Sequence, residues 1–103
     1  MYRIALVCQH GASTGICMRK MIEAAEKMDI ACEIDAYSDA ELGEIIDQMH
    51  CILLAPQLSF KLDRFQQEYP EYAGKLAVIS AMDFGMMDGE KILKEAIARI
   101  ESL

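Results

Sequence analysis

The sequence lacks long hydrophobic runs and has few basic residues. No apolar stretch among its 103 residues approaches the roughly 20 residues that a helix needs to cross a bilayer. Lys and Arg number 10 against 17 Asp and Glu, which gives a formal net charge of -7. Because basic side chains supply most of the affinity for nucleic acid, this composition argues against a nucleic-acid partner.

Metal-binding and disulfide patterns are also missing. The sequence has no CxxC pair, and neither His10 nor His50 stands at zinc-finger spacing from a cysteine pair. We therefore expect no metal and no other cofactor. The cysteines are Cys8, Cys17, Cys32 and Cys51. We interpret the last three as small packing residues, and Cys8 is considered separately below.

What is present is the composition of an ordinary globular protein. Hydrophobic residues make up 53% of the chain and charged residues 26%, which excludes intrinsic disorder. The length predicts one domain over residues 1–103. A strand-like segment begins at Tyr2, which is too early for a signal peptide, so we expect a soluble protein of the cytoplasm.

Apolar segments alternate with amphipathic segments along the chain. The patterns predict strands over residues 2–8, 30–37, 50–55 and 75–80, and helices over residues 14–28, 38–49, 61–68 and 88–100. Ser38 and Glu41 form a capping box, and Asp88 caps the last helix. The alternation predicts a three-layer α/β domain, with helices on both faces of a four-stranded parallel sheet of order 2-1-3-4.

This strand order places two loops at a ligand-binding position. Ligands of open α/β sheets bind at the carboxyl ends of the strands where the strand order reverses, here between strands 1 and 3. The loops at that point are residues 9–14 and 56–60, and Cys8 ends the first strand. We expect Cys8 to be exposed at the rim of this crevice.

The loop after Cys8 has the residues of an anion site. Gly11 and Gly15 permit close backbone approach, and Ser13 and Thr14 are natural helix caps. Backbone N–H groups in such a turn bind anions, and the same field favours a thiolate on Cys8. The combination indicates a nucleophilic sulfur that accepts a phosphoryl group.

A cysteine-dependent phosphatase is the competing interpretation. Small tyrosine phosphatases place Arg six residues after the cysteine, whereas here Thr14 holds that position and the next arginine is Arg19. Asp83 is the nominal leaving-group acid, with little to support it. A phosphoryl carrier therefore fits better than a hydrolase, and a non-catalytic binding module stays as a third possibility.

Three segments resemble the enzyme IIB components of the bacterial phosphotransferase system (PTS), in the lactose/cellobiose (N,N′-diacetylchitobiose-like) family. They are residues 4–14, 52–58 and 83–89, in the order of the family, and the match covers essentially the whole chain. The resemblance implies a fold like that of the low-molecular-weight tyrosine phosphatases. Phe84 stands where tyrosine is common, so a role for that hydroxyl is absent.

The resemblance also implies a reaction and its partners. Cys8 would accept a phosphoryl group from a phosphohistidine of the IIA component and pass it to a sugar bound by the membrane component IIC. The sugar would be a disaccharide of the cellobiose, lactose or chitobiose type, and the protein would associate with the membrane through IIC. The loop holding the phosphoryl group would be Gln9, His10, Gly11, Ala12, Ser13, Thr14 and Gly15.

Several further residues near this loop have two interpretations each. Gln57 and Asp83 are candidates for contacts with the loop or a partner, and ordinary turn chemistry explains Gln57 equally well. His10, when protonated, would steady the thiolate or the phosphoryl group, but a solvated loop side chain is favoured. Three methionines would form either a docking surface or part of the core: Met82, Met86 and Met87.

Overall fold

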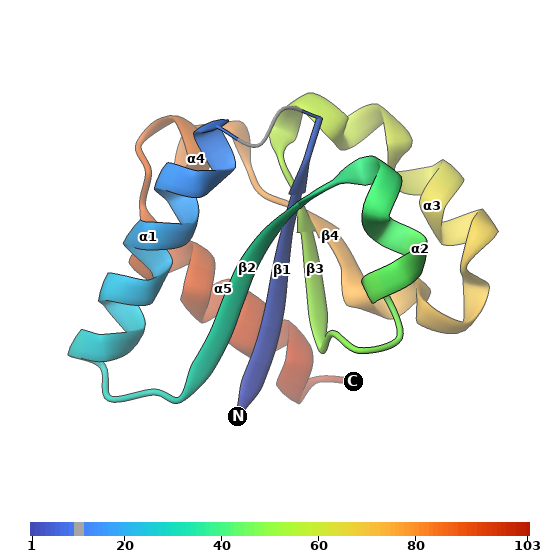
Figure 1. Cartoon of the computed structure of the whole chain (residues 1–103). Coiled ribbons are helices and arrows are strands. Elements are labelled where there is room, and N and C mark those ends of the chain that lie inside the picture. Colours follow the sequence, from blue (N-terminus) through green and yellow to red (C-terminus); the bar gives the residue numbers. More distant parts are fainter. Residues whose placement is uncertain (10–11) are drawn as a thin grey trace.

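Four parallel strands form one sheet in the computed structural model, which describes residues 1–9 and 12–103. The strands are β1 (Tyr2–Cys8), β2 (Cys32–Ser38), β3 (Cys51–Leu54) and β4 (Leu76–Val78). Their order is β2-β1-β3-β4, which confirms the predicted order (Figure 1). The order reverses between β1 and β3, because the chain adds β2 on one side of β1 and β3 on the other.

Helices cover both faces of the sheet. They are α1 (Ala12–Lys27), α2 (Leu42–Ile45), α3 (Leu62–Glu68), α4 (Ala81–Gly85) and α5 (Gly89–Glu101), with 3-10 turns η1 (Asp39–Glu41), η2 (Pro56–Lys61) and η3 (Pro70–Lys75). Figure 1 shows α1, α4 and α5 on one side of the sheet and α2 and α3 on the other. This confirms the predicted three layers.

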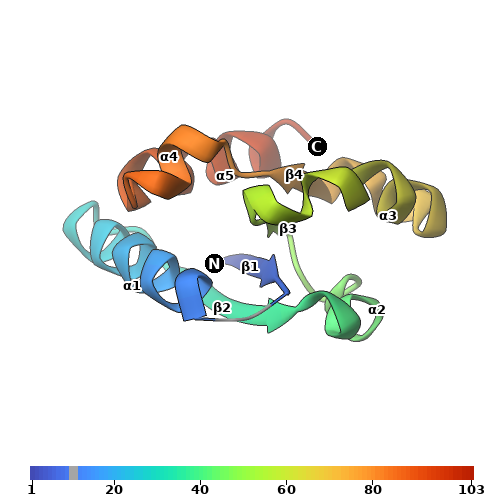
Figure 2. The same ribbon diagram turned by 90° about the horizontal axis from the view of Figure 1, so that it is seen from above.

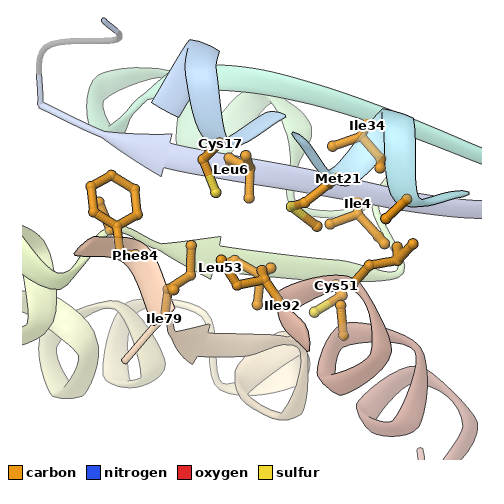
Figure 3. Packing of buried hydrophobic residues seen from close by; sticks show 14 of the residues in the cluster. Ile4, Leu6, Cys17, Met21, Ile34, Cys51, Leu53, Ile79, Phe84 and Ile92 are labelled. Atoms are coloured by element: carbon orange, nitrogen blue, oxygen red, sulfur yellow. The ribbon is translucent and has the colours of Figure 1, made fainter. Parts of the chain in front are cut away.

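The central strand β1 supplies side chains to both cores. Ile4 and Leu6 belong to the cluster beneath α1 and α5, and Ala5 and Val7 to the cluster beneath α2 and α3. All four are 0% exposed, which explains why residues 4–8 of β1 form an unbroken apolar run. Figure 3 shows the first cluster, where Ile4 lies beside Met21 of α1. Burying each large side chain contributes about 1.5–3 kcal/mol.

Both predicted caps are present, although one helix is shorter than predicted. The Glu41 carboxylate accepts hydrogen bonds from the Ser38 backbone N–H at 3.0 Å and the Ser38 hydroxyl at 3.1 Å. The helix beyond this box stops at Ile45 instead of reaching Met49, because the Gln48 N–H bonds the Ile45 carbonyl and tightens the last turn. Met49 still packs in the core.

Sequence patterns did not predict helix α4. The predicted fourth strand extended to Ser80, but β4 ends at Val78 and the Ser80 hydroxyl instead accepts a hydrogen bond from the Asp83 N–H at 3.1 Å. The helix ends at Gly85, and Met87, just beyond the C-cap Met86, has a φ of 49° in the left-handed region. The Met87 and Asp88 N–H groups bond the carbonyls of Phe84 and Asp83, so the end is a Schellman motif.

Helices α1 and α5 touch where α5 begins. A Cβ atom built at Gly89 would lie 2.4 Å from the Lys20 carbonyl carbon and 2.5 Å from its oxygen. Both atoms belong to the backbone of α1, so neither can rotate away. Only glycine lets the two helices approach this closely.

We expect Gly89→Ala to lower the free energy of unfolding by about 1–3 kcal/mol, because the methyl group forces α5 away from α1. Urea unfolding followed by circular dichroism measures this change. The matched control is Gly85→Ala, because a Cβ at Gly85 meets no atom within 4 Å. Equal stability of the two variants would contradict the proposed close contact.

Candidate functional site

The carboxyl ends of β1 and β3 meet at the point where the strand order reverses. Cys8, the last residue of β1, is paired with Ser38 of β2. On the other side, the Ala55 N–H bonds the Val7 carbonyl at 2.9 Å, so β3 continues beside β1 up to the site. In Figure 2, which looks down on this edge, α1, α4 and the segment of η2 surround the end of β1.

Cys8 lies at the predicted edge of the sheet, but the prediction that it is exposed is wrong, because the side chain is buried. Its exposed fraction is 8%, because its side chain belongs to the cluster beneath α1 and α5. The hydroxyl of Thr14 donates a hydrogen bond to the Cys8 sulfur, with 3.5 Å between Oγ1 and Sγ. Thr14 itself is 0% exposed. The sulfur is therefore held by a buried polar partner at the edge of the core.

Helix α1 begins close behind Cys8. Its first residue is Ala12, two positions before the predicted start, and it runs for 16 residues. The first N–H groups of a helix have no partner within the helix and carry partial positive charge, so they attract anions. This part of the predicted anion site therefore begins four residues after the sulfur.

The structure describes only some of the other residues of the predicted loop. Gln9 is exposed and Gly15 is partly buried. His10 and Gly11 lie outside the described residues, and only the backbone of Ala12 and Ser13 is described. The predicted phosphate cradle of residues 9–15 thus stays a prediction, apart from the position of Thr14.

Gln57 and Asp83 lie on the two segments that follow β3 and β4. Gln57 is exposed near the start of η2. Asp83 is 4% exposed, and its carboxylate forms an ion pair with Lys91 of α5 at 3.2 Å. This hydrogen bond and charge raise the pKa of Lys91 above its usual value. The pair anchors α4 to α5.

Two other thiols are buried in the core. Cys17 and Cys51 are both 0% exposed, as expected for packing residues. Burial raises the pKa of the Cys17 thiol to about 11 and that of the Cys51 thiol to about 11. Both are therefore neutral near pH 7 and poor nucleophiles. Figure 3 shows Cys17 on α1 beside Leu6 of β1.

Four exposed apolar side chains lie on the segments that follow β1, β3 and β4, and we call them the apolar rim. They are Ile16 on α1, Phe60 on η2, Met82 on α4 and Met86 at the end of α4, with exposed fractions of 43%, 75%, 71% and 72%. Ile16 recurs at helical spacing with the buried Cys17 and Met21 of the same helix, and yet it is exposed. Met82 and Met86 are exposed and so are not part of the core, whereas Met87 packs partly against it.

An ion pair joins two segments at the same edge of the sheet. The Lys61 ammonium, at the end of η2, lies 2.5 Å from the Asp39 carboxylate of η1, and both side chains are about one-fifth exposed. The hydrogen bond from Lys61 lowers the pKa of Asp39 below its usual value. Lys61 is thus engaged within the protein and fixes η2, which carries Phe60.

None of the helices in residues 1–9 and 12–103 combines the length and the hydrophobicity that a transmembrane span requires. The described chain is instead an open parallel α/β domain with a cysteine at the strand-order reversal and a hydroxyl on its sulfur. In open α/β sheets this is the position at which ligands bind.

Comparison with known proteins identifies the family. Residues 3–95 match the family "PTS system, Lactose/Cellobiose specific IIB subunit". The oligo-beta-mannoside-specific EIIB component of Bacillus subtilis (strain 168) is 33% identical over 98 residues, 95% of this chain and 95% of that protein. The galactose-specific EIIB component of Lactococcus lactis subsp. cremoris (strain MG1363) is 34% identical over 99 residues, 90% and 91% of the two chains.

A solved structure with a similar fold belongs to the same kind of protein as these relatives. The solution structure of a cellobiose-specific phosphotransferase IIB component from Borrelia burgdorferi has a TM-score of 0.83 and 31% identity, and the match covers 98% of this chain and 93% of that one. The chain therefore belongs to the lactose/cellobiose-specific IIB family, a phosphotransferase component of sugar transport. These relatives are 31–34% identical to this chain, but their names give different sugars.

We expect Asp39→Asn to lower the free energy of unfolding by about 1 kcal/mol at pH 7, because it removes the charge that Lys61 contacts. The pKa of Asp39 is lowered in the folded state, so the contribution is complete above about pH 4 and is lost as the pH falls further. Urea unfolding at pH 7 and pH 3 measures the difference.

Glu68→Gln is the matched control for this prediction. Its carboxylate pairs with Arg64 on the exposed surface of α3, with 43% and 69% of the two side chains exposed. We expect it to change stability by less than about 0.5 kcal/mol. If Asp39→Asn lowers the free energy of unfolding as much at pH 3 as at pH 7, the effect does not come from the charge of Asp39.

Proposed function

We propose that Cys8 carries the phosphoryl group in this IIB protein, and that residues 1–103 act as one IIB domain. The observation that supports this most is the position of the sulfur: it ends the central strand at the strand-order reversal, four residues before a helix N-terminus. The other buried thiols, Cys17 and Cys51, lack this position and are held neutral by burial.

The first transfer takes the phosphoryl group from a phosphohistidine of IIA. The Cys8 thiolate attacks phosphorus, the S–P bond forms, and the P–N bond breaks with its electron pair remaining on the imidazole nitrogen. In the second transfer a sugar hydroxyl attacks phosphorus and the S–P bond breaks. Its electron pair returns to sulfur, and the hydroxyl proton leaves to a base of the acceptor complex.

The protein contributes position and charge to these steps. Phosphoryl transfer has a loose transition state, so oriented N–H groups that stabilise oxygen charge are more useful than covalent help. The N-terminus of α1 and the predicted cradle of residues 9–15 supply such groups. Because Cys8 is only 8% exposed, donor and acceptor must approach it from the carboxyl edge of the sheet.

The apolar rim is the evidence that protein partners dock at this edge. One sulfur both receives and releases the group, so IIA and the sugar-binding membrane component IIC must dock at the same edge in turn. Phe60, Met82 and Met86 are each more than two-thirds exposed there. Methionine adapts its shape, which suits a surface with two successive partners. Docking on IIC would also hold the protein at the membrane.

A phosphatase function has weaker support. The chain has no arginine between Cys8 and Arg19 to hold a phosphate in a bidentate grip. Asp83, the nominal leaving-group acid, is buried in an ion pair with Lys91 and is not presented to a substrate. A carrier that retains the phosphoryl group until an acceptor arrives needs neither feature.

Incubation with phosphorylated IIA is expected to add the mass of one phosphoryl group to the intact protein, located on the Cys8 peptide. Cys8→Ser should gain no cysteine-bound phosphoryl group, because the thiolate is the acceptor. The matched control is Cys32→Ser, which removes a half-buried thiol from the start of β2 and should be phosphorylated like the wild type. If the wild-type protein gains no phosphoryl group but still binds IIA, the protein is a non-catalytic binding module and the carrier proposal is wrong.

Replacing the rim residues is expected to weaken docking without changing the sulfur. Phe60→Ala and Met82→Ala should each lower kcat/KM for transfer from IIA roughly 5- to 30-fold, about 1–2 kcal/mol of lost binding. Leu103→Ala is the matched control, because Leu103 is 68% exposed at the C-terminus. Equal rates for all three variants would contradict the rim as the docking surface.

A further inference from the structure

The hydroxyl of Thr14 points at the reactive sulfur. Thr14 is the third residue of α1 and is completely buried, and its Oγ1 lies 3.5 Å from Cys8 Sγ. In the sequence Thr14 fits a helix cap, and the family resemblance places it in the loop that would hold the phosphoryl group. In the structure its hydroxyl donates a hydrogen bond to the Cys8 sulfur.

A buried hydroxyl at this position is not explained by packing alone. Valine has nearly the shape of threonine and would fill the same space beneath α1 without a polar group to satisfy. Buried hydroxyls in proteins bond a partner, and this partner is the atom that makes and breaks the S–P bond. The contact therefore joins a polar group to the reacting atom.

We infer that Thr14 is a catalytic residue that stabilises the Cys8 thiolate relative to the phosphocysteine. This inference rests on the proposed carrier function. A hydrogen bond to a negatively charged acceptor is stronger than one to a neutral acceptor. The Thr14 O–H bond to sulfur is therefore strongest before phosphoryl uptake and after release, and weakest while the phosphoryl group is attached.

This difference makes Cys8 a better leaving group. As the S–P bond breaks, its electron pair moves onto sulfur, and the Thr14 hydroxyl meets the charge that develops there. The proton stays on Thr14 throughout, so the hydroxyl stabilises charge without acting as an acid. The phosphoryl group is consequently passed on more readily than from an unassisted cysteine.

Two variants separate the hydroxyl from the shape of the side chain. Thr14→Val removes the hydroxyl and keeps the branched shape, whereas Thr14→Ser keeps the hydroxyl and loses a methyl group. Thermal unfolding of both variants checks that each is folded. A role in packing affects both, but a role of the hydroxyl affects only the valine variant.

The first measurement is the rate of iodoacetamide alkylation of Cys8 against pH, in protein that carries no phosphoryl group. Peptide mass analysis follows Cys8 separately from half-buried Cys32. In Thr14→Val the midpoint of the rate profile should move up by about one pH unit, the effect of one charged hydrogen bond. Thr14→Ser should stay within about 0.3 pH units of wild type.

The second measurement is transfer from phosphorylated protein to sugar in membranes that contain IIC. The phosphoryl group should leave Thr14→Val roughly tenfold more slowly than wild type or Thr14→Ser. If wild type becomes phosphorylated but the valine and wild-type profiles coincide, or both variants shift equally, the role of Thr14 is overturned and the carrier function stands. If wild type is never phosphorylated, the carrier function itself is overturned, and this inference with it.

Discussion

The burial of β1 on both faces is the constraint on which the rest of the structure depends. Its apolar residues fill two cores at once, so the strand must lie at the centre of the sheet, with β2 on one side and β3 on the other. That position makes the carboxyl end of β1 the point where the strand order reverses. The packing of the residues before it places Cys8 at that point.

The segments around Cys8 are fixed by interactions of a different kind. Helix α4 is held by the Asp83–Lys91 ion pair and η2 by the Asp39–Lys61 ion pair. Both segments carry exposed apolar side chains, while their charges are used within the protein. The result is an edge with a buried cysteine, a hydroxyl that is hydrogen-bonded to its sulfur, and the exposed apolar rim.

The sheet and most of its helices could be predicted from the sequence, because they rest on long periodic patterns. The strand order followed from apolar runs alternating with amphipathic segments, and the caps at Ser38 and Asp88 were found where predicted. Helix α4 was missed because its five residues are too few to show a helical period. Its cap, Ser80, also lay within the predicted strand.

The site was predicted less completely, since it depends on tertiary contacts. A cysteine before a small-residue turn indicated the nucleophile, but the low exposure of Cys8 follows from how α1 packs on the sheet. Thr14 fits the pattern of a helix cap, so nothing in the spacing indicated a bond to sulfur. Periodicity likewise shows which face of a helix is apolar and cannot show, for Ile16, that no element covers it.

A single-turnover chase tests the central claim most directly. Protein labelled with radioactive phosphoryl groups by IIA is mixed with membranes that contain IIC and its sugar. If Cys8 is a carrier, the label leaves the Cys8 peptide at the rate at which sugar phosphate appears, and without sugar it stays on the protein. Release of the label as inorganic phosphate at the same rate with and without sugar would contradict this account.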